Sequence, residues 1–458
     1  MPLSLQKWGP AAICFGAVLA VCLVFHYRAP FHDHWDLIPL YEALRSGELA
    51  FSDLFALHGN HWHASAYMVL LGLSLFTGMA HGVESVASVA FAGLGFIALV
   101  RILSRSIALL GSANAVPWVM GMSAFFLFSL DQSANWLWGW QVAVFINIAC
   151  ALWMIERLSF GSITIGNTLL AAALCAVAIY AFGTGWTLIP IGLILLVFRG
   201  ALVSGSGRAA LLIWAGLTAL LLWHFALSLN DTAAAYSTSA LPNLMDVGTW
   251  IGLVHYALNF VASPIVRFAR DSSLIAILIG AGVLVWSIWT LRAADKQRVW
   301  QVAAPFLAMA AFSFGSGLLT AIGRWEGFGV QHAFVSRYIS FGTPFWVAVF
   351  VLAFFAIAKT NHRSHKRAFA VLGLLFVLKL GNIPSVVQKS VRISNEISAV
   401  TKQLAIAYPN VSPDDYAVLH NPLQEIDPRL AVLSEYEVSF FANPSDPDEY
   451  APVDEGDQ

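Results

Sequence analysis

The chain has 458 residues, of which 59% are hydrophobic and only 11% are charged. Soluble globular domains carry about 25% charged residues, so this composition excludes a soluble globular protein. The apolar residues form continuous runs of about 20 rather than an alternating pattern, which favours membrane-spanning helices over a β-barrel. The four cysteines lie inside these runs and offer neither a disulfide framework nor a cysteine-based zinc site. We therefore predict an all-α polytopic membrane protein with no nucleic-acid partner.

In chain order, eleven apolar segments are predicted to cross the membrane. They are residues 11–27, 85–103, 116–130, 139–155, 167–182, 185–199, 209–228, 273–291, 301–321, 338–358 and 367–382. The segment 64–79 is also apolar, but it is about 16 residues long, short for a hydrocarbon core of roughly 30 Å. We expect it to be a short, interfacial or partly inserted helix. If it crosses fully, the number of spans is twelve.

The distribution of basic residues predicts how the spans are oriented. One set of alternating loops is rich in Arg and Lys, whereas the opposite loops carry few basic residues after residue 103. Because basic loops stay in the cytoplasm, the N-terminus is predicted to be cytoplasmic and the C-terminus external. From Pro409 onward the chain has twelve acidic residues and one basic residue, Arg429, so the external tail is acidic. The basic set is Arg101, Arg105, Arg157, Arg199, Arg208, Arg292, Lys296, Arg298, Lys359, Arg363, Lys366 and Arg367.

Two domains are expected, a membrane domain over residues 1–382 and an external soluble tail over 383–458. Two long external loops interrupt the membrane domain. The first, 28–64, is predicted to contain an amphipathic helix at about 34–45, a short helix from Ser52 and a polar segment. The second, 229–272, is predicted to carry an interfacial helix within Val247–Val261, because polar or small residues follow one helix face there. In the tail, 394–406 is expected to be helical and the last fifteen residues disordered.

The first external loop begins with the motif Phe31-His32-Asp33-His34-Trp35-Asp36. A carboxylate just outside the first membrane helix is suited to act as a general base towards a bound hydroxyl. It is also suited to a divalent cation, because hard cations such as Mg²⁺ or Mn²⁺ prefer oxygen ligands. A purely structural alternative is a capping box, in which Asp33 and Asp36 bond to backbone N–H groups at a helix start.

A histidine-rich segment, His58-Gly59-Asn60-His61-Trp62-His63, follows in the same loop. Three histidines in six residues suggest a metal site, but their spacing is not the i, i+4 pair of a helical zinc motif. Polar contact of His58 and His61 with a phosphate headgroup is a second interpretation. An ordinary interfacial loop is the third.

Three other segments that are predicted to be external, 131–141, 183–186 and 323–338, are rich in aromatic or basic residues. Tryptophans at an interface usually form an aromatic belt, but sugars also stack on aromatic rings and hydrogen-bond to Asp, Asn and Gln. The arginines are suited to phosphate oxygens, with lipid-headgroup anchoring or pairing to Glu326 as the plainer alternatives. The candidate sugar- or acceptor-binding residues are Asp131, Asn135, Trp136, Trp138, Gln141 and Trp186, and the candidate phosphate-binding residues are Arg324, Arg337 and Tyr338.

Taken together, the acidic motif after the first helix, the large first external loop, the histidine-rich segment and Ser336-Arg337-Tyr338 resemble bacterial members of the GT-C superfamily. These are membrane glycosyltransferases that use polyprenyl-phosphate sugars. The resemblance extends loosely over residues 1–382 and is more architectural than motif-exact. It implies that Asp33, or else Asp36, is the catalytic base and that Arg337 and Arg324 bind the lipid phosphate. His34 stands where several families have a second acid, which leaves a metal requirement open.

The sequence therefore predicts an enzyme of the bacterial inner membrane that transfers a monosaccharide from a polyprenyl-phosphate carrier. The acceptor is a glycan, a lipid or a protein at the external face. Three other classes stay open: a lipid-glycan flippase or transporter, an O-antigen ligase or polymerase, and a non-catalytic subunit of a glycan-assembly complex. Transport predicts charged residues and broken helices inside the spans, and most polar residues here lie instead near the external face.

Overall fold

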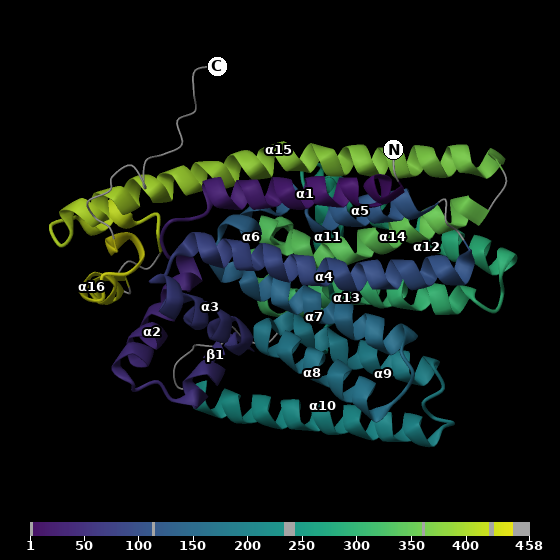
Figure 1. Cartoon of the computed structure of the whole chain (residues 1–458), viewed down its shortest axis with the longest axis horizontal. Helices are drawn as coiled ribbons and strands as arrows, with labels where there is room; N and C mark the ends of the chain where they lie inside the picture. Colours follow the sequence, from purple (N-terminus) through teal and green to yellow (C-terminus); the bar gives the residue numbers. More distant parts are fainter. Residues whose placement is uncertain (1–2, 112–114, 233–242, 360–361, 421–425, 443–458) are drawn as a thin grey trace, which may run out of the picture.

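The computed structural model describes residues 3–111, 115–232, 243–359, 362–420 and 426–442. Long helices lie side by side along the longest axis of the molecule, with the N-terminus near one end of the bundle (Figure 1). We call the end that carries the short hairpin of β1 (Leu57–His58) and β2 (His61–Trp62) the hairpin end. The other end, where Glu156 lies among arginines, is the arginine end.

Within the described residues, nine helices are long and apolar enough to cross a membrane, and three shorter apolar helices accompany them. The chain is thus an all-α polytopic membrane protein. The bundle helices are α1 (Leu3–Phe25), α4 (His81–Leu110), α5 (Val116–Leu127), α7 (Val142–Phe160), α8 (Ile165–Ala181), α9 (Leu188–Phe198), α10 (Gly205–Thr232), α11 (Val247–Val266), α12 (Ser273–Ala294), α13 (Val299–Phe328), α14 (Ile339–Lys359) and α15 (His362–Ala407).

Helix α14 lies at the centre of the bundle. Buried side chains make up 94% of its apolar window, and its neighbours include α5, α11, α12 and α13. A helix that is apolar on every face is stable only where other helices or lipid surround it. The short 3₁₀ helix Ser336–Tyr338 leads directly into α14, so the buried helix fixes the place of Arg337 at the hairpin end.

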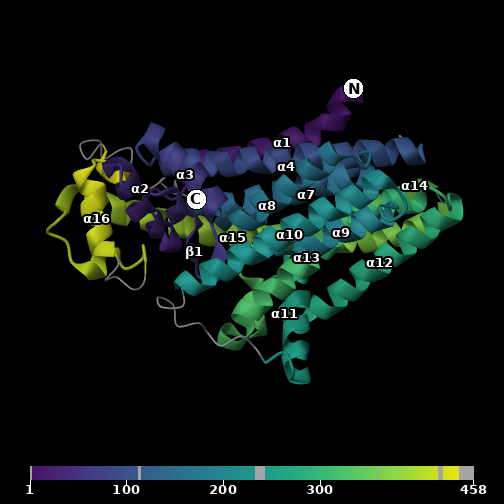
Figure 2. The same ribbon diagram turned by 90° about the horizontal axis from the view of Figure 1, so that it is seen from below.

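Helix α11 turns only part of its small and polar face inward. Gly252 lies against Trp325, and Asn259 donates a hydrogen bond of 3.1 Å to the Val330 carbonyl, whereas Gly248 and His255 are exposed. Val247 and Ile251 lie on the exposed face. Its 20 residues are long enough for a span, yet Figure 2 shows α11 running across the direction of the other long helices. The apolar face is therefore available to lipid, while protein partners satisfy the polar groups.

Helix α3 (Ala64–Thr77) stays at the hairpin end. It has 14 residues, or about 21 Å at 1.5 Å per residue. It begins directly after β2, and the carbonyl of Gly78, just beyond its last residue, accepts a hydrogen bond of 2.8 Å from the Ser439 amide of the tail. Its two ends therefore lie at the same end of the bundle.

Helix α15 passes through the predicted boundary between residues 382 and 383 without a break. It has 46 residues, or about 69 Å, more than twice the thickness of a hydrocarbon core of roughly 30 Å. Figure 1 shows it running along the whole bundle and beyond it at the hairpin end. The predicted helix 394–406 is the last part of α15, and the last fifteen residues, which were predicted to be disordered, lie outside the described residues.

The tail and the first external loop share one hydrophobic cluster instead of forming separate units. Trp35 and Tyr41 of the loop belong to the same cluster as Ile397 and Leu404 of α15 and Leu430 of α16 (Ile426–Glu435). Helix α2 (Leu37–Ser46) contributes Leu37 and Ile38 to it. Burying this apolar surface fixes the loop, and with it the turn that carries the acidic motif, against the tail.

The arginine end collects the basic loops that the charge pattern predicted to be on one side. The buried Glu156 carboxylate lies 3.0 Å from Arg101 Nε, 3.3 Å from Arg105 and 3.6 Å from Arg157. Arg199 donates a hydrogen bond of 3.1 Å to the Leu158 carbonyl. These contacts join the ends of α4, α7 and α9 at one face of the bundle.

Candidate functional site

The acidic motif forms a 3₁₀ helix, η1 (His32–Asp36), between α1 and α2. Asp36 occupies the N-cap position of α2 but makes no capping hydrogen bond there. Phe31 is the N-cap residue of η1 and also has no side-chain cap. The predicted capping box between Asp33 and Asp36 is therefore wrong. Both carboxylates are left for other contacts.

The histidine-rich segment folds into the β1–β2 hairpin, which places His58 directly opposite His61. Gly59 takes a positive φ of 60°, as tight two-residue hairpin loops require. Trp62 of β2 fixes the hairpin to α10, because its indole N–H donates a hydrogen bond of 3.2 Å to Ser228 Oγ. The Trp62 ring also stacks on His224 with centroids 4.8 Å apart. The tight turn and the buried indole together fix the histidines against the acidic motif.

His58 lies between the two carboxylates of the motif. Its Nδ1 is 3.2 Å from Asp36 Oδ2, and its Nε2 is 3.8 Å from Asp33 Oδ2. Burial lowers the pKa of His58, but hydrogen bonds and charge attraction from Asp33 and Asp36 outweigh burial and raise the pKa to about 9. His58 is thus an imidazolium at neutral pH, so it is not available as a general base.

The two carboxylates differ in what they are free to do. Asp36 is bound on both sides, to His58 and, through Oδ1 at 3.0 Å, to Arg429 of α16. Asp33 keeps 51% of its side-chain surface exposed. Burial raises the pKa of Asp33, but contact with His58 and the charges of His58 and Arg337 outweigh burial and hold that pKa well below its usual range. Asp33 is therefore an accessible anion, while Asp36 serves as an internal counterion.

Arg337, Arg324 and Tyr338 gather near this turn. The Asn135 side chain donates a hydrogen bond of 2.9 Å to the Arg337 carbonyl. The Arg337 guanidinium lies 5.5 Å from the centroid of the Tyr338 ring. Burial and then the charges of Arg337 and Arg324 lower the pKa of His332 to about 4. Both guanidinium groups therefore act on one region of the hairpin end, where an anionic group would be attracted.

His61 and His63 are uncharged at neutral pH, unlike His58. Burial, followed by the charges of His58 and Arg324, lowers the pKa of His61 to about 3, and burial and the charge of His58 hold the pKa of His63 well below its usual value. The His63 ring stacks on Trp140 with centroids 4.3 Å apart. Neither ring nitrogen of His63 has a hydrogen-bond partner. Of the two histidines predicted to contact phosphate, His58 carries a positive charge and His61 does not.

Three of the predicted sugar-binding residues are used in packing. Asp131 and Lys379 form an ion pair of 2.5 Å, and both side chains are 0% exposed. The Asn135 side-chain amide donates hydrogen bonds to the Arg337 carbonyl and to Ser340 Oγ. The Trp136 ring stacks on Phe145 with ring centroids 4.1 Å apart. These side chains support the turn that carries Arg337 and leave little surface for a ligand.

The other predicted aromatic and amide residues lie closer to the acidic motif. Trp138 is nearly buried, and its ring lies 5.5 Å from Phe31 and 6.2 Å from His32, edge to face. Gln141 is buried at the start of α7, and Trp186 is partly buried beside Trp62, at 6.2 Å between ring centroids. Trp138 is thus the predicted stacking residue that borders the carboxylate turn.

Two important partners were not anticipated from the sequence. Lys379 is a single basic residue inside an apolar run, and this is itself a signal for a functional or paired charge in a membrane protein. Arg429 is the single Lys or Arg residue from Pro409 onward. Their positions were visible in the sequence, but their partners, Asp131 and Asp36, were not.

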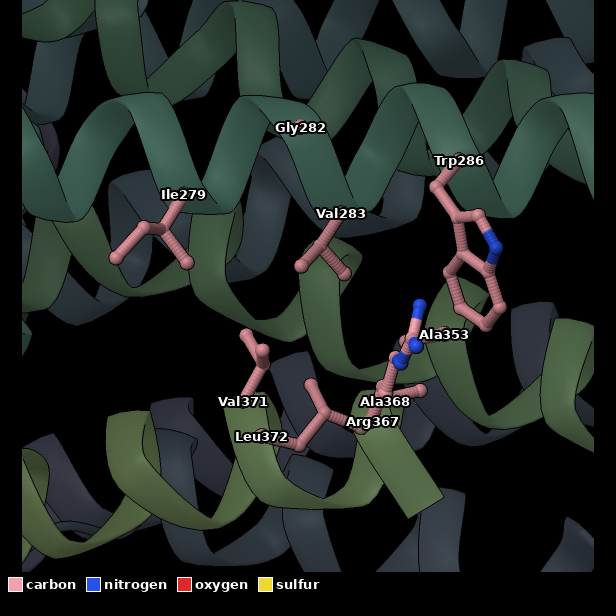
Figure 3. Close-up of a pocket in the computed structure, with 9 residues that line it drawn as sticks. All are labelled: Ile279, Gly282, Val283, Trp286, Ala353, Arg367, Ala368, Val371 and Leu372. Atoms are coloured by element: carbon pink, nitrogen blue, oxygen red, sulfur yellow. The ribbon is translucent and has the colours of Figure 1, made fainter. Parts of the chain in front are cut away.

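An apolar cavity lies away from these residues. It has a volume of about 880 Å³ between α12, α14 and α15. Figure 3 shows Ile279, Val283, Trp286 and Val371 around it, with Arg367 as its charged member. It is an apolar groove on the half of the bundle that faces the arginine end, and none of the predicted site residues lines it.

Comparisons of the chain with protein-family models, with curated proteins and with solved structures gave no match.

Proposed function

We propose that this protein is a membrane glycosyltransferase of the GT-C type, in which Asp33 accepts the proton of the acceptor hydroxyl. The observation that carries the proposal is that Asp33 is an accessible anion beside an imidazolium, His58, and under the positive field of Arg337. The resemblance of the acidic motif and of the Arg-Tyr pair to this superfamily supports the same reading. The donor in this proposal is a polyprenyl-phosphate-linked monosaccharide.

The proposed reaction is a single displacement. The acceptor oxygen forms a bond to the anomeric carbon while the bond between that carbon and the phosphate oxygen breaks. Asp33 takes the hydroxyl proton, and the bonding pair leaves with the polyprenyl phosphate. Arg337 and Arg324 supply the positive field for the charge that develops on the departing phosphate. Attack opposite the leaving group inverts the anomeric configuration.

Asp36 has a supporting role in this proposal. It binds His58 and Arg429, so it holds the imidazolium in place beside Asp33. The imidazolium keeps Asp33 ionised, which is the form of the carboxylate that can accept a proton, while the lowered pKa reduces its basicity. The assignment separates the two carboxylates that the sequence left equivalent: Asp33 as base and Asp36 as a positioning residue.

We also propose eleven crossings, with the arginine end in the cytoplasm. The transverse direction of α11 and the short length of α3 support this number. The arginines at the opposite end support the orientation. The acidic motif, the tail and the C-terminus are then periplasmic in a bacterial inner membrane. A reporter fused after Gln458 that is active only in the cytoplasm would reverse this orientation.

The test is a transfer assay in membranes with labelled polyprenyl-phosphate sugars. Wild type is compared with Asp33→Asn and Arg337→Ala, and with Asp271→Asn as a control, because Asp271 is an exposed carboxylate in another loop of the hairpin end. We expect transfer to be lost in the first two variants and kept in the control. Full transfer by Asp33→Asn would remove the base assignment. Lipid translocation without transfer from any donor would favour the flippase.

A further inference from the structure

A second cluster of polar side chains is buried beside the acidic motif and shares His34 with it. It consists of His34 from η1 and of His81 and Glu84 from the first turn of α4. The exposed fractions are 1% for His34, 5% for His81 and 1% for Glu84. Burying a carboxylate with two imidazoles costs free energy unless the charge is balanced, so this group requires an explanation.

The spacing of the three side chains matches a coordination sphere. Glu84 Oε2 lies 2.9 Å from His81 Nδ1 and 3.5 Å from His34 Nε2, and the three candidate ligand atoms lie within 4.8 Å of one another. Zinc bonds of about 2.0–2.1 Å in tetrahedral geometry place ligand atoms about 3.4 Å apart. The two measured separations bracket that value, and the remaining pair, His34 and His81, lies within 4.8 Å, so the two imidazoles would move toward each other to surround one ion.

Some polar atoms of the cluster have a hydrogen-bond partner and others have none. Glu84 Oε1 and His34 Nε2 are buried without a hydrogen-bond partner. The second ring nitrogen of His81, Nε2, is bonded to Ser439 Oγ at 2.9 Å. Metal-binding histidines usually donate their other ring N–H in this way, which fixes the tautomer and the ring direction. Of the two unpartnered atoms, His34 Nε2 lies 3.5 Å from Glu84 Oε2, on the side where an ion would sit.

We propose that His34, His81 and Glu84 bind one divalent transition-metal ion, with Zn²⁺ as the best match to two imidazoles and one carboxylate. Mg²⁺ is a poorer match, because it prefers an all-oxygen octahedral shell. Three protein ligands leave a fourth position for a water molecule. The site does not depend on the glycosyltransferase proposal, and the metal has no assigned part in the transfer step.

The ion would connect three parts of the hairpin end. His34 lies between Asp33 and Asp36, Glu84 belongs to α4, and Ser439 belongs to the tail that bonds to His81. Ser439 takes a positive φ of 58°, a conformation that a non-glycine residue adopts only where its contacts hold it. The proposed metal therefore fixes the acidic turn and the tail to the start of α4.

Gly139 provides a second way to perturb the cluster. A Cβ atom at this position would overlap the Glu84 carboxylate and its Cβ. Gly139→Ala therefore displaces the proposed ligand without removing any ligand atom. This variant tests whether metal binding depends on the position of the Glu84 carboxylate, because all three ligand groups are still present.

The experiment uses the full chain, purified in detergent through a tag without histidines, treated with a chelator and then supplied with Zn²⁺ or Co²⁺. Metal content is measured by elemental analysis, Co²⁺ geometry by visible absorption, and stability by thermal unfolding. We expect one bound ion, a tetrahedral Co²⁺ spectrum and a higher unfolding temperature in wild type. Affinity should fall by more than about 100-fold in His81→Ala and Glu84→Gln, since even outer-shell changes cost about 10–100-fold.

The matched control is His63→Ala, because His63 is a buried histidine outside the cluster whose ring nitrogens have no hydrogen-bond partner. It should keep the ion. Wild type that binds no Zn²⁺ or Co²⁺ would overturn the proposal and leave a hydrogen-bonded cluster. An ion lost from His63→Ala but kept by His81→Ala would move the site to the hairpin and also overturn it. Because wild type alone gives the first result, a variant that fails to fold does not decide the outcome.

Discussion

Two aspartates of the hairpin end, Asp131 and Asp33, lie in segments that the sequence marks as candidate sites, yet their surroundings are opposite. Asp131 is fully buried and paired with Lys379 at 2.5 Å. Asp33 is half-exposed, and its nearest charged partner, His58, lies 3.8 Å away. A buried pair has given up its hydration and is held by its partner, whereas an exposed anion can still meet a ligand. The difference separates a structural carboxylate from one suited to chemistry.

The largest expected effect is on the buried pair. Lys379→Met leaves Asp131 as an unpaired buried charge, which destabilises a protein by about 3–5 kcal/mol. We expect most of the variant to be lost as folded protein when it is extracted in detergent and measured by size-exclusion chromatography. The double variant Asp131→Leu with Lys379→Met should recover much of the yield. A single variant as stable as wild type would show that the pair is not structural.

Removing the exposed carboxylate of Asp33 should reduce transfer activity and leave stability nearly unchanged. Asp33→Asn is expected to reduce transfer by about 10²–10⁴-fold, the usual contribution of a general base, with little change in unfolding temperature. Asp36→Asn should reduce transfer less and stability more, because Asp36 holds His58 and Arg429. Initial rates and thermal unfolding of the same preparations provide the comparison. If the two variants have equal effects on both measurements, the division of roles is incorrect.

The ion pairs of His58 should make stability depend on pH. The pKa of His58 is raised from 6.5 to about 9 in the folded protein. The stabilisation is therefore fully present below pH about 6.5 and is lost as the pH rises through about 9. Its upper bound is about 3 kcal/mol at 1.36 kcal/mol per pKa unit. We expect the unfolding temperature of wild type to fall between pH 6.5 and 9.5, and that of His58→Gln to change less. Parallel curves for the two proteins would contradict this assignment.

The smallest expected effect concerns the guanidinium fork. Arg337→Lys keeps the positive charge but loses the planar pair of donors, so the KM for the lipid donor should rise by about tenfold, or about 1.4 kcal/mol. Arg337→Ala should raise it further. The control is Arg270→Lys, because Arg270 is an exposed arginine of the same end whose guanidinium lies over Phe334. A KM that Arg337→Lys leaves unchanged would favour a purely electrostatic role for this side chain.

Much of the fold follows from hydrophobic runs. Apolar segments of about 20 residues must form helices in lipid, so the positions of most long helices could be predicted from composition alone. The end of α15 could not. Its apolar run stops near residue 382, but the helix continues because Ile397 and Leu404 pack against the first external loop. The inward packing of Gly252 and Asn259 in α11 could not be predicted either, because their partners, Trp325 and Val330, lie more than 70 positions away in the sequence.

The sequence by itself determined the membrane class, the helical content and the acidic and histidine-rich motifs, because these depend on local composition and spacing. Tertiary structure decided which charged groups meet. Asp131 and Lys379 are 248 positions apart, and His81 and Ser439 are 358 positions apart. No local pattern encodes such pairings. They arise when the tail folds back on the first loop and α15 packs beside α5 and the turn after it. This packing buries Asp131 against Lys379 and leaves Asp33 half-exposed.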